Sequence, residues 1–178
     1  MTHQDVPDAL RPGLKLVIVG INPGARSGAS GHAYAHAGNH FWRLMFESGL
    51  VTQPLTYVED HRVLEWDIGL TNLCDRTTPS MAGLTPAEMR EGAATLRHKL
   101  LQCRPRVVAF NGMGIYETFS GRKRVKPGLQ EETLDGMRMF ALPSSSGRTA
   151  AYLWPAKLAL FQELKRLVDS VSTEAVAT

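Results

Sequence analysis

The residues of this sequence that could carry chemistry lie in three segments rich in small and polar residues. These segments read GINPGARSGASGHAYAHAGNHF at 20–41, TNLCDRTTPS at 71–80 and LPSSSGRTAA at 142–151. A glycine-rich loop can bind a nucleotide, histidines spaced by four residues can bind a metal ion, and serines can act as nucleophiles or hold a phosphate. Each of these chemistries needs further residues at fixed spacing, so the sequence can be tested for them.

The templates for nucleotide binding are incomplete in the first segment. The run from Gly20 to Gly24 has neither the spacing nor the lysine of a P-loop, and Gly28 and Gly31 form only a fragment of the dinucleotide-binding fingerprint. Ordinary nucleotide binding is therefore a remote alternative, supported only by the position of the loop.

The histidines and serines also lack the partners that their simplest roles require. His32, His36 and His40 would share one face of a helix, but the glycines and alanines around them disfavour that helix. Neither cysteine belongs to a close pair, so we predict no metal site. The serines at 144–146 lack the GxSxG elbow of a serine hydrolase, and they suit either a phosphate clamp with Arg148 or a polar turn.

Alternating strands and helices are predicted to position these loops. Short apolar runs typical of strands buried in a parallel sheet occur at 15–20, 67–73, 106–112 and 137–142. Helices are predicted at 39–49, from a capping box at 85–88 to about 103, at 112–119 and at 155–168. This order predicts an α/β fold, a three-layer α/β/α sandwich with a short, mainly parallel central sheet. The three segments then follow the carboxyl ends of strands, where such sheets bind ligands.

The composition is that of one globular domain over residues 1–178. With 43% hydrophobic residues the chain can bury one core, which we place at about 14–168, with the first dozen residues and 170–178 frayed. No apolar run approaches the roughly 20 residues of a membrane-spanning helix, and no signal peptide is expected, which favours a cytoplasmic protein, or a nuclear one in a eukaryote. The net charge of +3 permits a polyanionic partner, and GRKRVKPG at 121–128 is either a phosphate contact or a solvated basic loop.

Five blocks of this sequence, in nearly colinear order between about 14 and 168, resemble the mismatch-specific uracil and thymine DNA glycosylases of the uracil-DNA glycosylase superfamily. They are GINPG at 20–24, GNHFW at 38–42, TNLCDRTTP at 71–79, FNGMGIYETFS at 110–120 and LPSSSGR at 142–148. The resemblance implies the fold of that superfamily and hydrolysis of the N-glycosidic bond of a flipped-out base, with no metal and no cofactor. The implied substrate is uracil opposite guanine in double-stranded DNA, with thymine in G·T pairs or modified pyrimidines as further substrates.

The resemblance also implies roles for residues of the first two segments. Asn22 would orient the attacking water, the alternative being that it only turns the chain. Asp75 would activate water or support the cationic sugar, or else form an ion pair with Arg76. For His32, His40 and Trp42 we expect packing or supporting roles. The base site would be formed by Gly20, Ile21, Tyr34, Asn39 and Asn72, with Tyr34 against the pyrimidine ring.

The contacts with DNA would come from the third segment and the basic loop. Ser144 would hold a phosphate, and Lys123 would add another phosphate contact. The wedge that fills the space of the extruded nucleotide would comprise Ser145, Ser146, Gly147 and Arg148. No lysine occupies a motif position suited to a Schiff base, so we predict a monofunctional enzyme of base excision repair that leaves an abasic site. We expect the enzyme to be a monomer. A non-catalytic DNA-binding module of the same fold is the alternative.

Overall fold

Apolar, β-branched runs form the central sheet of the molecule. The computed structural model describes residues 6–149 and 151–176. The sheet has five strands in the order β2-β1-β3-β5-β4. All neighbouring strands are parallel except β4 and β5, which are antiparallel. The strands are β1 (Leu16–Gly20), β2 (Ile68–Asn72), β3 (Val107–Asn111), β4 (Gly128–Leu134) and β5 (Met137–Leu142).

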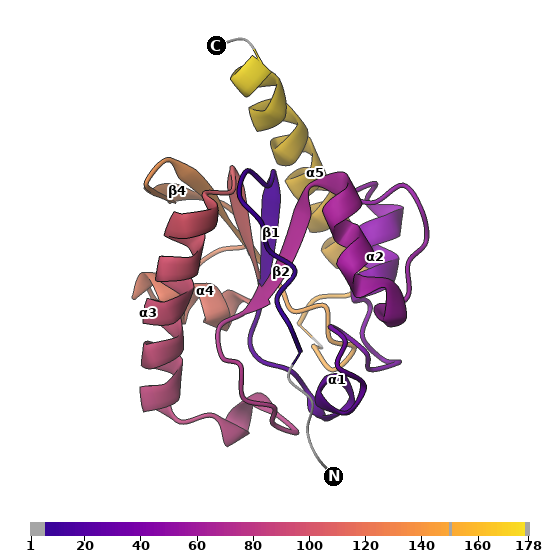
Figure 1. Ribbon diagram of the computed structural model, residues 1–178, viewed down its shortest axis with the longest axis vertical. Helices are drawn as coiled ribbons and strands as arrows, with labels where there is room; N and C mark the ends of the chain where they lie inside the picture. The colour runs from indigo at the N-terminus through magenta and orange to yellow at the C-terminus, as the bar shows by residue number, and fades with distance from the viewer. Residues whose placement is uncertain (1–5, 150, 177–178) are drawn as a thin grey trace.

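Helices cover both faces of this sheet (Figure 1), with α3 and α4 on one face and α2 and α5 on the other. Successive residues of β1 point to opposite faces, so that Leu16 and Ile18 pack in the core under α2 and α5, and Val17 and Val19 in the core under α3 and α4. The predicted three-layer sandwich is confirmed. The helices are α1 (Ala25–Ser30), α2 (Phe41–Glu47), α3 (Pro86–Cys103), α4 (Met113–Ser120), α5 (Trp154–Val176) and the 3₁₀ helices η1 (Tyr57–Trp66) and η2 (Met81–Gly83).

Helix α3 begins at the predicted capping box. The Thr85 hydroxyl accepts a hydrogen bond from the N–H of Glu88, and the Glu88 carboxylate accepts one from the N–H of Thr85 at 2.7 Å. Pro86 occupies the first turn, where a missing N–H costs nothing. The cap fixes the start of α3 next to the loop that follows β2.

Both predicted frayed ends are more ordered than expected. The main chain of Ala9 pairs with Leu70 of β2, and the Asp8 carboxylate lies 2.7 Å from the Lys99 ammonium. At the other end α5 continues as far as Val176, and residues 177–178 lie outside the described part. The expectation of frayed ends is therefore wrong for these segments.

The carboxyl ends of the four parallel strands meet at one edge of the sheet. In Figure 1 this edge faces downward, and α1 and the loops after β1, β2 and β5 gather there. Among the residues that the structure describes, no helix is both long enough and apolar enough to cross a membrane. The three polar segments of the sequence thus share one end of the fold.

Candidate active site

The loops that follow β1 and β2 are joined by main-chain hydrogen bonds. The N–H of Leu73 donates to the carbonyl of Gly20 at 2.8 Å, and the N–H of Thr78 donates to the carbonyl of Pro23 at 3.1 Å. Asn22 lies between these two contacts. It is thereby held against a loop more than 50 residues away in the sequence.

The Asn22 carboxamide has one chemically sensible orientation. Its Nδ2 atom donates to the main-chain carbonyl of Arg76 at 2.8 Å and to the Thr78 hydroxyl at 2.7 Å. Since a carbonyl can only accept, the amino group must face Arg76, while Thr78 donates its own proton to the carbonyl of Ser80 at 2.6 Å. No described residue makes a hydrogen bond to the Asn22 Oδ1 atom, and the side chain is partly exposed. The carboxamide oxygen is therefore available to an outside donor such as water.

An ion pair fixes the chain at Arg76. The guanidinium binds both carboxylate oxygens of Glu88, at 2.6 and 3.0 Å, and the carbonyl of Gly83 at 2.7 Å. The hydrogen bond from Arg76, together with the N–H of Thr85, lowers the pKa of Glu88 to about 2. The expected alternative, an ion pair between Asp75 and Arg76, is wrong because Glu88 takes the guanidinium. This pair holds the carbonyl that orients Asn22.

Asp75 points toward solvent on the α3 side of the loop. Its side chain is 77% exposed, and its Oδ1 lies 3.8 Å from the Lys99 ammonium. Asp75, Asn72 and Lys99 border a hollow of about 200 Å³ between β2 and α3, which Asn22 does not line. No described contact joins Asp75 to Asn22, so a catalytic role for Asp75 stays a prediction.

Three residues predicted for the base site do lie together at the end of β1. A Cβ atom at Gly20 would lie 2.5 Å from Asn72 Oδ1 and 3.0 Å from the Tyr34 hydroxyl, so a larger residue at Gly20 would displace both side chains. The Tyr34 hydroxyl is buried, and no described residue gives it a hydrogen bond of normal geometry. Burial raises the pKa of Tyr34 to about 12, an effect that the neighbouring Asn111 amide partly offsets. Tyr34 is therefore a neutral phenol with an unused donor, whereas Ile21 packs into the core under α3 and α4.

The Tyr34 ring is fixed by stacking. It lies nearly parallel to the Phe41 ring, with centroids 3.8 Å apart and an interplanar angle of 16°. Its main chain adopts φ 54°, a left-handed conformation that costs a residue with a Cβ atom about 1–2 kcal/mol. Contacts around the loop must hold it there.

A buried polar network joins Asn39 to the loop that follows β5. The Ser145 hydroxyl donates to Asn39 Oδ1 at 2.7 Å and accepts from Asn111 Nδ2 at 2.8 Å, while the N–H of Ser145 donates to Asn111 Oδ1 at 3.0 Å. Ser145 is fully buried, so the structure does not fit its predicted contact with DNA. It instead fixes Asn39, whose Oδ1 also accepts the N–H of Phe41. The Nδ2 group of Asn39 is then the part left to bind a ligand.

The tip of the loop after β5 is formed by Gly147 and Arg148, which are both exposed. Ser144 and Ser146 are partly buried, and their hydroxyls accept main-chain N–H groups within the loop. Lys157 of α5 is only 2% exposed and donates to the carbonyl of Ser146 at 2.9 Å. Desolvation lowers the pKa of this lysine. The loop is thus held from beneath while its tip faces solvent.

The basic loop at 121–127 reaches the same edge of the sheet. It leads into β4, whose first residue, Gly128, pairs with Ala141 one residue before the end of β5. Lys123 is exposed there. The register of β4 therefore places the end of this loop at the edge of the sheet where β1 ends, and the contact of Lys123 with a phosphate stays a prediction.

The sequence did not identify four residues that shape this region: Thr78, Asn111, Lys157 and Asp60. Asn111 is the last residue of β3 and Thr78 lies in the loop that follows β2, both within the quoted sequence blocks, so their polar side chains near strand ends were the available signal. Lys157 and Asp60 lie in helices with no signal of this kind.

The three histidines of the first segment have separate surroundings. His32 contacts Asp60, His36 accepts the N–H of Gly38, and His40 packs edge-on against Trp154.

Comparisons with known proteins identify the family and the fold of this chain. Residues 7–167 match the sequence model of the Uracil DNA glycosylase superfamily. The chain is 38% identical over 159 residues to a G/U mismatch-specific uracil DNA glycosylase of Schizosaccharomyces pombe, an alignment that covers 84% of this chain and 49% of the relative, so the chain spans about half of that protein's length. The solution NMR structure of a candidate uracil DNA glycosylase from Methanosarcina acetivorans has a similar fold, with a TM-score of 0.60 and 22% identity over 93% of this chain and 99% of the other.

Proposed function

The chain belongs to the uracil DNA glycosylase superfamily, and on that basis we propose that it is a monofunctional glycosylase that removes uracil mispaired with guanine from double-stranded DNA. The proposal extends to this chain the activity named for the Schizosaccharomyces pombe relative. Thymine in G·T pairs and modified pyrimidines are proposed as further substrates. The enzyme would act in base excision repair, wherever the DNA of its cell lies, as a monomer and without a cofactor.

The single observation that carries this proposal is the orientation of Asn22. Its Nδ2 group is used by Arg76 and Thr78, which leaves Oδ1 to accept a hydrogen bond from water at the end of β1. A water held there would add its oxygen to C1′ of a flipped-out deoxynucleotide while the bond from C1′ to the base breaks. The water's proton passes to solvent, since a carboxamide is too weak a base to take it.

The expected chemistry is slow, because Asn22 positions the water without activating it. Positioning alone removes much of the entropic barrier, but the sugar still reaches an oxocarbenium-like state and the base leaves as an anion. We propose Asn22 as the water-binding residue in preference to Asp75, whose carboxylate is largely exposed and directed toward Lys99.

Polar groups of the predicted base site support recognition of a pyrimidine. Asn39 offers its Nδ2 donors, and Asn72 and the unused Tyr34 hydroxyl lie against Gly20. A pyrimidine held by the Tyr34 ring would present its carbonyl oxygens to such donors, which also stabilise the negative charge of the departing base.

Exposed groups at the same edge support binding to DNA. Gly147 and Arg148 form the tip that would enter the duplex beside the orphaned guanine, together with the partly buried Ser146, while Ser144 and Lys123 would contact phosphates. Extrusion costs less for a mispaired base than for a paired one, so a G·U pair is opened more readily than an A·T pair. Selection for mismatches can thus precede bond cleavage.

A duplex labelled on the uracil strand tests the proposal. We expect the wild-type protein to generate alkali-labile sites in a G·U duplex, with less product from A·U, G·T and single-stranded substrates, and no strand break before alkali. Binding of the G·U duplex without any alkali-labile product would favour the alternative, a non-catalytic DNA-binding module.

A further inference from the structure

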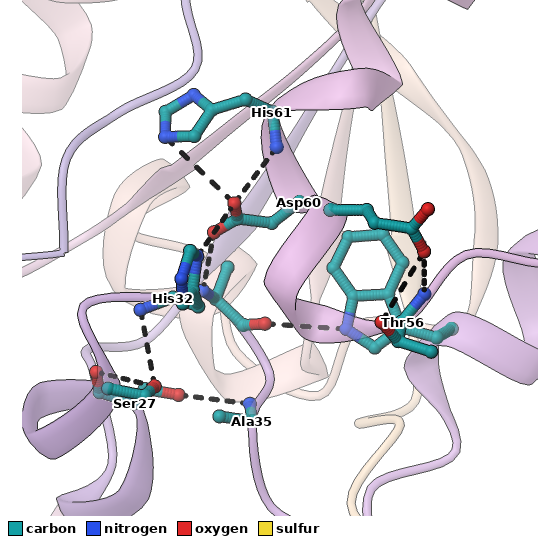
Figure 2. Close-up of polar contacts among 10 residues, drawn as sticks. Ser27, His32, Ala35, Thr56, Asp60 and His61 are labelled. Atoms are coloured by element: carbon teal, nitrogen blue, oxygen red, sulfur yellow. Dashed lines mark hydrogen bonds and ion pairs between the residues drawn. The ribbon is translucent and has the colours of Figure 1, made fainter.

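Asp60, in η1, is a buried carboxylate that the proposed mechanism does not use. It is 3% exposed, and its Oδ2 accepts the N–H of Ala33 at 2.8 Å while its Oδ1 accepts the N–H of His61 at 2.9 Å. His32 Nδ1 lies 3.1 Å from Oδ1. Figure 2 shows these contacts converging on the carboxylate. Within the described residues, the ion-pair partners of Asp60 are the two histidines. The hydrogen bonds that the buried carboxylate would make with water are therefore replaced in large part by those from main-chain N–H groups.

The contact with Ala33 bears directly on Tyr34. Tyr34 has a left-handed main chain, which persists only where neighbouring contacts fix it. Both of its neighbours are held by other elements: the carbonyl of Ala33 accepts from Trp42 Nε1 at 3.3 Å, and the N–H of Ala35 donates to the Ser27 hydroxyl at 3.2 Å. Figure 2 shows Ala35 beside Ser27 and His32 beside Asp60 in this loop. Of these three hydrogen bonds, the one from the N–H of Ala33 to the Asp60 carboxylate is the shortest, and it alone involves a charged group. Hydrogen bonds to charged groups are stronger than those between neutral groups.

We infer that Asp60 is a positioning residue for the base site: it fixes the main chain at His32 and Ala33 so that Tyr34 can hold an extruded pyrimidine. This inference rests on the proposed function and deepens it. The contacts of Asp60 are with His32, Ala33 and His61 and not with Asn22, so its removal should weaken capture of the base and leave other contacts with DNA unchanged.

Asp60→Asn tests this role with almost no change in shape. The two oxygens of Asp60 each accept a main-chain N–H, from Ala33 and from His61. A carboxamide has one oxygen and one amino group, so the N–H of Ala33 either faces the amino group or keeps a hydrogen bond to an uncharged oxygen, and its contact is weakened in both orientations. Glu65→Gln is the matched control, because it removes the same charge from the same helix, and the hydrogen bonds of its carboxylate go to Arg62.

The measurement is binding to two duplexes at equal salt. One carries 2′-fluoro-deoxyuridine opposite guanine, in which the fluorine blocks cleavage, and the other carries a tetrahydrofuran abasic analogue. We expect Asp60→Asn to weaken binding of the uracil duplex by about tenfold or more, as for the loss of one charge-assisted hydrogen bond. Binding of the abasic duplex should weaken by less than about twofold. Glu65→Gln should change neither. Hydrogen exchange of the Ala33 amide should accelerate in Asp60→Asn alone.

The outcomes separate this inference from the function on which it rests. Equal weakening of both duplexes by Asp60→Asn, or unchanged binding of the uracil duplex, would overturn the role of Asp60. A wild-type protein that generates no alkali-labile sites in the G·U duplex would refute the proposed function itself. In that case faster exchange at Ala33 would still show that Asp60 holds the loop, but not that it serves a base site.

Discussion

Replacement of Thr78 by valine tests how the Asn22 carboxamide is oriented. The Thr78 hydroxyl accepts one of the two hydrogen bonds from Asn22 Nδ2, at 2.7 Å, and it is buried with the rest of its side chain. Valine keeps the shape but removes this acceptor, while the bond to the carbonyl of Arg76 at 2.8 Å remains. The loss of one restraint of about 1–1.5 kcal/mol predicts a fall of about tenfold in the single-turnover rate of excision.

Thr78→Ser separates this effect from loss of stability. Thr78→Val also leaves the carbonyl of Ser80 without its donor, which costs about 1 kcal/mol of unfolding free energy. Serine keeps both hydrogen bonds but loses the methyl group that packs near Gly83, a cost of about 0.8 kcal/mol. The two variants should therefore lower the melting temperature by similar amounts, and only valine should slow excision under single-turnover conditions. Equal rates in both variants would refute the proposed orientation of Asn22.

Three further predictions follow from single contacts. Ser145→Ala should lower the unfolding free energy by about 1–3 kcal/mol, because the Asn111 amino group loses its buried acceptor, and should weaken binding of a uracil-containing duplex; urea unfolding and binding curves measure both. Glu88 has a pKa of about 2 in the fold against an ordinary 4.5, so it stabilises the fold above pH 4.5 and this contribution is lost as the pH falls toward 2; Glu88→Gln should therefore show a smaller drop in melting temperature between pH 5 and 3. Asp75→Ala should change the excision rate by less than about threefold, as for an exposed ion pair, and a loss of two orders of magnitude would instead make Asp75 catalytic.

The sequence predicts the framework of the fold well because its signal is local. The run at 15–20 is apolar and β-branched, and it forms a fully buried strand. The capping box at Thr85 is read from four consecutive residues and begins α3 as expected. Strand β4, GLQEETL, escapes this reasoning because it pairs with β5 alone, is largely exposed and carries polar side chains where an inner strand would carry apolar ones.

The candidate site is predictable only in part, because its geometry depends on contacts between distant loops. The resemblance and the strand-end rule indicate Asn22, but the orientation of its amide depends on Arg76 and Thr78, which lie in another loop. Ser145 lies in a polar, glycine-containing loop whose residues are expected to be exposed. It is buried because its hydroxyl pairs with Asn39 and Asn111, which lie elsewhere in the chain. Asp60 contacts a loop 27 residues earlier in the chain, and no pattern in the sequence indicates that pairing.

The most direct test of the central claim is the single-turnover rate of uracil excision by Asn22→Ala in a G·U duplex, measured with enzyme in excess over DNA and beside the affinity for an abasic duplex. If the Asn22 oxygen holds the attacking water, the rate falls by at least about 100-fold while the abasic duplex binds as in the wild type. An excision rate close to that of the wild type would contradict the assignment.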